Sequence, residues 1–305
     1  MRKKNKKSST LKKFLFVLFI LAILGGVLRA YSLYTKVYQP NIAFADSKQE
    51  HFVYIPTGSE FIDVISILNS SGLLINTNSF QWVAKKKNYF NNIKPGRYFI
   101  DSEMNNNELV NMLRSGEQAP VRVTFNNVRT IEDFCAKISA QIEVDSTSIL
   151  DYITDSLFLN KLRLNRYNVG SLFIPNTYEF YWNTSAKQFV SRMLKEYKNF
   201  WNSNRKIKAE KIGLNYYQIS VLASIVEKEQ NIKKDERPMI AGLYLNRLKK
   251  GMKLESDPTL IFALGDFDIK RVLNKDKRVK SPYNTYKYKA LPPGPICIPS
   301  IKAID

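Results

Sequence analysis

Histidine and cysteine are scarce in this sequence, whose 305 residues contain one histidine and two cysteines. His51 is the only histidine and follows closely after the apolar N-terminal run, so a histidine-dependent triad and a histidine-rich metal site are excluded. Cys135 and Cys297 are far apart and have neither metal-ligand spacing nor a CxxC motif. Two buried thiols are the favoured interpretation, and a disulfide between them is the alternative.

Acidic residues are also few, with 27 aspartates and glutamates against 47 lysines and arginines and a net charge of +20. A basic protein fits three kinds of partner, namely nucleic acid, anionic lipid or an acidic polymer. The sequence has no zinc finger, RNP motif or basic heptad pattern, so we expect no nucleic-acid partner.

One long apolar run is present, from Phe14 to Leu28. Extended to Tyr34, with Arg29 reaching the interface, it predicts a transmembrane anchor over residues 14–34. Seven basic residues precede position 14, which places the tail of residues 1–13 in the cytoplasm and the remaining chain outside. The expected location is therefore the cell (inner) membrane, with a single pass. A cleaved signal peptide is the alternative, but no clear A-x-A site follows.

Beyond the anchor the pattern predicts an α+β protein. Residues 35–50 are mixed and polar and are typical of a linker, and residues 51–117 form a small unit of two strands with helices between and after them. Its expected elements are a strand at 51–55, a helix capped by Ser59, a helix at 78–86, a strand at 97–100 and a helix at 107–113. The larger region, 118–305, begins with a strand at 121–125 and a helix led by Thr130, which weakly repeats the pattern of residues 52–68. Residues 146–205 read as helices with polar breaks, interrupted by an aromatic, proline-containing loop at 170–180.

A helix ending at Glu229 carries the candidate chemistry. Asn215 and Gln218 resemble a capping box at its start. At 100° per residue, Glu229 lies within about 60° of the apolar stripe around Leu222, whereas Glu227 points about 140° away. A carboxyl group on an apolar face loses hydration, which favours the protonated form that a general acid needs. The alternative is an ordinary helix-end glutamate that pairs with a lysine or arginine.

The residues that follow could form a cleft for a sugar. A second helix has Pro238 in its first turn and Gly251 after its end, and its Arg247 could bind a substrate carboxylate or extend along the edge of the core. Three loops, at 255–259, 281–286 and 291–295, are rich in hydroxyl, amide and aromatic groups, which suit sugar hydroxyls and an apolar sugar face. Turn formation alone also selects such residues.

Together these segments resemble a known family, the MltG (YceG-like) endolytic murein transglycosylases. The resemblance covers nearly the whole chain after the anchor and includes a LysM-like subdomain at 51–117 and a catalytic region at 118–305. Its motifs occur in the family's order at Leu172–Phe180, Leu222–Glu229, Leu245–Leu248, Ser256–Thr259, Tyr283–Tyr286 and Leu291–Gly294.

The resemblance implies a reaction and its residues. Such enzymes cleave the β-1,4 bond between N-acetylmuramic acid (MurNAc) and N-acetylglucosamine (GlcNAc) without water, and leave a 1,6-anhydro end. Glu229 is the expected catalytic acid and base, with no metal, no cofactor and no second catalytic carboxylate. Expected partners are peptidoglycan strands, membrane lipid and enzymes of cell-wall synthesis. The expected substrate-binding residues are Tyr178, Asn246, Arg247, Asp257, Thr259, Tyr283, Asn284 and Thr285.

The sequence also departs from the family pattern. Asn176 stands where the family tends to have aspartate, and Glu255 where glutamine is expected. The family pattern continues for some tens of residues beyond position 305, so a truncated catalytic region is expected. Two alternatives stay open: a wall-binding protein without catalysis, and a conventional muramidase that uses a second carboxylate such as Asp257.

Overall fold

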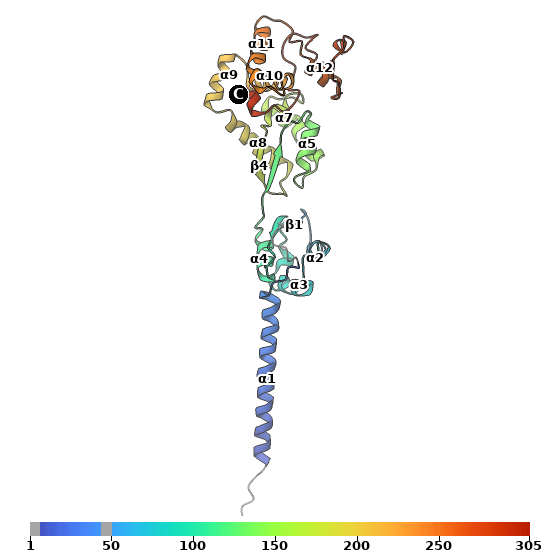
Figure 1. Cartoon of the computed structure of the whole chain (residues 1–305). Coiled ribbons are helices and arrows are strands. Elements are labelled where there is room, and N and C mark those ends of the chain that lie inside the picture. Colours follow the sequence, from blue (N-terminus) through green and yellow to red (C-terminus); the bar gives the residue numbers. More distant parts are fainter. Residues whose placement is uncertain (1–6, 44–50) are drawn as a thin grey trace, which may run out of the picture. The chain divides into compact units, whose positions relative to one another are not determined.

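The computed structural model describes residues 7–43 and 51–305, with side chains described from residue 11 onward. The chain divides into two compact units, Met1–Ala119 and Pro120–Asp305, here called the N-terminal and C-terminal units (Figure 1). Each contains a two-stranded antiparallel sheet and several helices, so the predicted α+β class is confirmed.

Helix α1, Lys7–Tyr38, is the long N-terminal helix in Figure 1. Its Leu11–Tyr38 stretch is long and apolar enough to cross a membrane, and this stretch is not buried inside the protein. The helix is longer than the predicted anchor and includes residues 7–13 of the predicted tail. Residues 1–6 of that tail lie outside the described residues.

The linker predicted over residues 35–50 is wrong at its start. Residues 35–38 belong to α1, and Asn41 and Ile42 are buried in the N-terminal unit. The side-chain amide of Asn106 donates to the Lys36 backbone carbonyl at 2.9 Å, and the side-chain amide of Asn41 donates to the side-chain oxygen of Asn106 at 2.8 Å. These polar contacts fasten the end of α1 to the unit, because buried amides need partners. Residues 44–50 lie outside the described residues.

The N-terminal unit has the strands and helices that its sequence pattern predicts. Strand β1, His51–Ile55, pairs antiparallel with β2, Gly96–Ile100, and places Val53 opposite Tyr98 in the core. The helices are α2 (Phe61–Ser70), α3 (Thr77–Lys86) and α4 (Asn106–Ser115), with a 3-10 turn η1 (Tyr89–Asn91). The cap of α2 is Glu60 rather than the predicted Ser59. Helix α4 ends at Gly116, whose φ of +78° favours glycine.

The first part of the C-terminal unit packs around a second sheet. Strand β3, Val121–Phe125, pairs antiparallel with β4, Asn176–Phe180. The loop predicted at 170–180 is therefore a strand in its second half, with Tyr178 and Phe180 buried in the core. The core that this sheet helps to form also includes residues of α5 (Ile131–Ser139), α6 (Ser146–Thr154), α7 (Ser156–Leu162), η2 (Val169–Leu172), α8 (Ala186–Phe200) and α9 (Ser203–Ile212).

The last part of the chain builds its own core around α10, Tyr216–Glu229. Helices α11 (Arg237–Lys249), α12 (Asp257–Leu264) and α13 (Ile301–Ile304) all contact α10. The 3-10 turns η3 (Lys234–Glu236) and η4 (Asp276–Arg278) complete this part. Every residue from Ser220 to Val226 is buried, so α10 is covered on all sides over this stretch, as expected of a helix in a protein interior.

Candidate active site

Glu229 is the last residue of α10, and its position is set by where this helix begins and ends. The Asn215 side-chain oxygen accepts from the Gln218 backbone N–H at 2.9 Å, and the Gln218 side-chain oxygen accepts from the Asn215 backbone N–H at 2.9 Å. This is the predicted capping box. At the other end Gln230 leaves the helical conformation, with φ −128°. Glu229 is exposed, so the burial that the helical-wheel argument predicted is not found.

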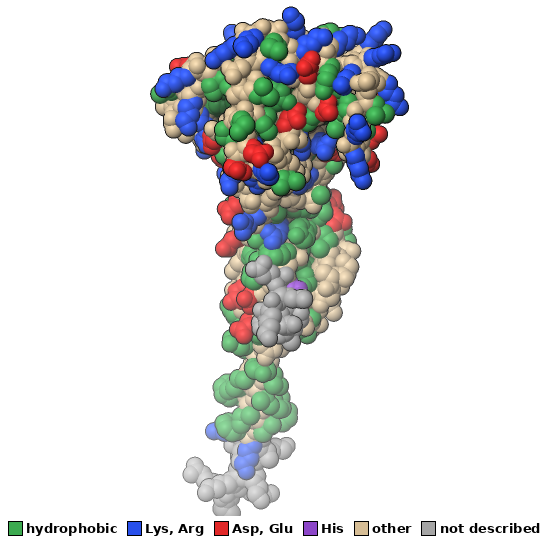
Figure 2. Space-filling view, turned by 45° about the horizontal axis from the view of Figure 1, so that its top comes forward, with side chains coloured by type: hydrophobic (Ala, Val, Ile, Leu, Met, Phe, Trp, Pro, Cys, Tyr) green, Lys and Arg blue, Asp and Glu red, His purple; other side chains and the backbone are tan. Residues whose placement is uncertain are grey.

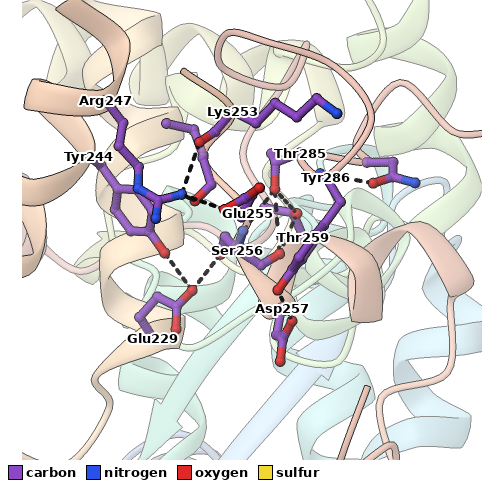
Figure 3. A network of polar contacts seen from close by, with 12 residues as sticks. Glu229, Tyr244, Arg247, Lys253, Glu255, Ser256, Asp257, Thr259, Thr285 and Tyr286 are labelled. Atoms are coloured by element: carbon purple, nitrogen blue, oxygen red, sulfur yellow. Dashed lines mark hydrogen bonds and ion pairs between the residues drawn. The ribbon is translucent and has the colours of Figure 1, made fainter. Parts of the chain in front are cut away.

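Two hydroxyl groups hold one oxygen of the Glu229 carboxylate (Figure 3). The Tyr244 phenol, on α11, donates to Oε1 at 2.6 Å, and the Ser256 hydroxyl, just before α12, donates to the same atom at 2.6 Å. Both donors are buried. Oε2 accepts no hydrogen bond from the described part of the chain. In the protonated acid the proton therefore belongs on Oε2, because Oε1 already accepts two hydrogen bonds.

The electrostatic setting keeps the tyrosine donors protonated. Burial, and next the hydrogen bond to Glu229, raise the pKa of Tyr244. Burial also raises the pKa of Tyr286, followed by its hydrogen bond to Asp257 at 2.7 Å and by the charges of Asp257, Glu255 and Glu229. Both phenols consequently remain donors at neutral pH.

A buried knot of hydroxyl groups holds Ser256 in place. The Ser256 amide donates to the Thr285 hydroxyl oxygen at 3.0 Å, and the Thr259 hydroxyl donates to the Ser256 carbonyl at 2.7 Å. The hydroxyl groups of Thr259 and Thr285 are 2.8 Å apart. All three residues are almost fully buried, so Thr259 and Thr285 stabilise the position of Ser256 from the protein interior.

The Arg247 side chain forms hydrogen bonds to other residues of the chain. Its Nη1 donates to the carbonyls of Lys253 and Leu254, both at 3.0 Å, and to the Glu255 carboxylate at 2.9 Å (Figure 3). Glu255 has a φ of +58°, a strained conformation for a residue with a side chain. Arg247 therefore helps to hold the turn that leads into Ser256.

Asn284 likewise organises a loop. It is fully buried, and its amide donates to the carbonyls of Lys277 at 3.0 Å and Val279 at 2.8 Å. Its side-chain oxygen accepts from the Tyr286 amide at 3.0 Å. Asp257 is exposed at the first turn of α12 and accepts from the Tyr286 phenol.

Three predicted residues do not join the network. Tyr178 is buried in the core beside β3, and its hydroxyl donates to the Ile174 carbonyl at 2.7 Å. Tyr283 is buried with its ring 4.7 Å from that of Phe262. Asn246 is exposed on α11, about 160° around the helix from Tyr244.

The structure also brings in residues that the sequence did not assign to the site. Ser256 and Tyr244 contact Glu229 directly, and Tyr286 contacts Asp257. The available signal was the cluster of hydroxyl residues in the two loops. It did not show which hydroxyls would point at the carboxylate.

Glu227, two residues before Glu229, lies in a mostly buried environment. Its side chain is only 16% exposed and accepts from Arg237 at 3.5 Å. The Ser300 amide and hydroxyl donate to it at 2.7 and 2.8 Å. The helical wheel predicts that Glu227 faces away from the apolar stripe around Leu222, and the contacts show that α11 and the segment before α13 pack over that other face.

Among the described residues, no group of three or more histidine, cysteine, aspartate or glutamate side chains could hold a metal ion. Cys135 and Cys297 are free and buried, as favoured from the sequence. Burial raises the pKa of the Cys135 thiol to about 12, so it is not a nucleophile at neutral pH.

These features define a class of protein. It is an α+β protein whose N-terminal helix could span a membrane, and it has an exposed carboxylate, Glu229, that is held by two hydroxyl donors. Residues 53–305 match the model of the YceG-like family, and the chain belongs to that family. The predicted resemblance is thereby confirmed.

Three relatives show what the chain is similar to. It is 29% identical over 267 residues to an endolytic murein transglycosylase of Bacillus subtilis, which covers 82% of this chain and 73% of that protein. It is 29% identical over 296 residues to a protein of the same name from Streptococcus pneumoniae, where 86% of this chain spans only about half (52%) of the relative. A crystal structure of a yceG-like protein from Listeria monocytogenes has a TM-score of 0.54 and 28% identity, covering 85% of this chain and 89% of that one.

Proposed function

We propose that this protein is a membrane-anchored endolytic peptidoglycan transglycosylase, with Glu229 as its acid and base. The observation that carries the proposal is an exposed carboxylate whose Oε1 accepts two hydrogen bonds and whose Oε2 accepts none from the described residues. The names of the relatives support peptidoglycan as the substrate.

The proposed reaction needs one carboxyl group and no water. Oε2 of protonated Glu229 gives its proton to the oxygen that joins MurNAc C1 to GlcNAc, and the C1–O bond breaks. The C6 hydroxyl of MurNAc attacks C1, and its proton returns to Oε2. The products are a GlcNAc end and a 1,6-anhydro-MurNAc end, and the enzyme is regenerated.

The other site residues have supporting roles in this proposal. Tyr244 and Ser256 hold Oε1 in both protonation states, since a carboxylate and a carboxyl carbonyl oxygen both accept hydrogen bonds. Asp257 and Asn246 are exposed and are the proposed contacts with sugar. Arg247, Thr259, Tyr283, Asn284, Thr285 and Tyr178 are proposed to act through the loops and the core that they hold together.

The location and the N-terminal unit are also part of the proposal. The basic residues before position 14 favour a cytoplasmic N-terminus, with both units outside the cell (inner) membrane. The N-terminal unit is proposed to be LysM-like. An anchored enzyme acts close to where new strands emerge, so we assign it the termination or trimming of nascent glycan strands, alongside enzymes of cell-wall synthesis.

The mass of the glycan products tests this function. Purified peptidoglycan is digested with the protein and with its Glu229→Gln variant, and the new ends are identified by mass spectrometry. Anhydro ends that depend on Glu229 support the proposal.

A conventional muramidase is the second candidate, because Asp257 lies in the same cluster of contacts as Glu229 (Figure 3). It predicts reducing ends, one water heavier than anhydro ends. A wall-binding protein without catalysis predicts no products, and binding that is unchanged by Glu229→Gln.

A further inference from the structure

A strongly basic surface segment lies close in sequence to the site loops. Residues 270–289, here called the basic segment, contain eight lysines and arginines and one acid, Asp276, a net charge of +7 (8 − 1). Its cations are Lys270, Arg271, Lys275, Lys277, Arg278, Lys280, Lys287 and Lys289. All except Lys277 are exposed, and within the described residues none forms an ion pair. Figure 2 shows lysine and arginine side chains along much of the rim of the C-terminal unit.

The basic segment is tied directly to the Glu229 network. Buried Asn284 donates to the carbonyls of Lys277 and Val279, and its neighbour Thr285 holds the Ser256 amide. The Lys277 ammonium lies 4.7 Å from the centre of the Tyr286 ring. Lys277 of the basic segment therefore lies beside Tyr286, whose phenol donates to Asp257 in the Glu229 network.

Charge changes sign between these two places. The centre holds the carboxyl groups of Glu229 and Asp257 and the ion pair of Glu255 with Arg247, and the charges of the three carboxyl groups act on Tyr286. An anion is repelled at such a centre and attracted to the unpaired cations beside it. The basic segment also has a surface hollow of about 290 Å³, lined by Lys280, Ser281, Pro282 and Tyr288, which offers a cation, a hydroxyl and an exposed aromatic ring.

We propose that the basic segment binds the carboxylates of the peptides that hang from glycan strands, so that the substrate is peptide-bearing rather than bare glycan. This inference rests on the proposed function. The nearly neutral sugar backbone lies over the acidic centre, while the anionic peptides lie on the basic flank. The arrangement orients the strand and raises its association rate, since complementary charge acts mainly on encounter and specificity.

The test separates binding from cleavage by using the full chain with Glu229→Gln. Its affinity is measured for soluble glycan strands with intact peptides and for the same strands after an amidase has removed the peptides. A basic-segment variant carries Lys275→Gln, Arg278→Gln, Lys280→Gln and Lys287→Gln. A matched control loses the same charge on α8 and α9, through Lys195→Gln, Lys198→Gln, Lys206→Gln and Lys211→Gln, all of them exposed positions.

We expect the basic-segment variant to bind peptide-bearing strands about tenfold more weakly at low salt, and the control to bind nearly as before. The difference shrinks as salt screens the charges. Equal weakening in both variants overturns the proposal, as does equal affinity of the Glu229→Gln protein for bare and peptide-bearing strands. Selective loss of binding to teichoic acid or to anionic lipid vesicles, with strand binding kept, also overturns it. Because no cleavage is measured, the result stands apart from the product test of the proposed function.

Discussion

Two regions at the end of α10 surround two glutamates that are separated by a single residue. Around Glu227, an arginine and a serine from other segments close over a mostly buried carboxylate. Around Glu229, two hydroxyls donate to one oxygen of an exposed carboxylate, and no residue in the described part of the chain donates to the other. The first arrangement satisfies a charge inside the fold, and the second leaves a carboxyl group accessible, as the proposed acid and base requires. Neighbours in sequence thus differ in role because different segments cover them.

The largest expected effect comes from Glu229→Gln. The amide cannot give or take the proton at the Oε2 position, so the rate of strand cleavage falls by about 10²–10⁴-fold. The unfolding free energy changes little, since the residue is exposed and the glutamine amide oxygen can still accept from Tyr244 and Ser256. Product formation and thermal unfolding are measured on the same preparation. Full activity in this variant shows that Glu229 is not the acid.

Removing either hydroxyl donor to Glu229 tests whether the fixed Oε1 contributes to the reaction rate. Tyr244→Phe and Ser256→Ala each delete one hydrogen bond to Oε1, and hydrogen bonds to charged groups contribute about 1.5–3 kcal/mol. We expect kcat to fall roughly tenfold or more in each variant, with a smaller change in KM. Ser256→Ala is a clean change, because the Ser256 side chain makes no capping hydrogen bond to α12.

A matched control for this pair is Tyr286→Phe, which removes the donor to Asp257 instead. The transglycosylase proposal expects a smaller effect there than at Ser256. A larger loss at Tyr286 than at Ser256 or Tyr244 favours the muramidase, which depends on Asp257.

Glu227→Gln tests the other side of the comparison. It leaves the almost fully buried Arg237 without its carboxylate and weakens the contacts with Ser300. We expect a loss of about 2 kcal/mol in unfolding free energy, with the specific activity of the folded protein kept within about threefold. Chemical denaturation and activity assays give the two numbers. A variant that is stable but inactive contradicts the distinction between the two regions.

Local signals predicted much of this part of the fold. The capping box at Asn215 and the helix end at Glu229 depend on residues within a few positions, so the sequence shows them directly. The pairing of β3 with β4 joins residues more than fifty positions apart, and the same loop residues could equally have formed a turn. The burial of Glu227 depends on Ser300, 73 positions later, which periodicity within one helix cannot reveal.

The site shows the same limit. The order of the motifs identified Glu229 and the loops that meet near it. The donors Tyr244 and Ser256 lie 15 and 27 positions away along the chain, and only the folded arrangement of α10, α11 and α12 brings them to one atom. Tyr178 was assigned to the site because it is aromatic and lies in a family motif. Its side chain instead faces inward on β4, where alternation along the strand places it in the core.

The smallest expected effect is at Tyr178. This prediction tests whether Tyr178 stabilises the core or contacts the substrate. Tyr178→Phe removes the hydrogen bond to the Ile174 carbonyl and costs about 1 kcal/mol of unfolding free energy at neutral pH, with kcat/KM unchanged. Burial raises the pKa of Tyr178 to about 12, compared with about 10 in an unfolded chain. The contribution of the protonated Tyr178 hydroxyl to the unfolding free energy is therefore complete below pH 10 and is lost as the pH rises toward 12. Denaturation from pH 8 to 11 should show a smaller alkaline loss in Tyr178→Phe than in the native chain, and a drop in kcat/KM would return Tyr178 to the substrate-binding set.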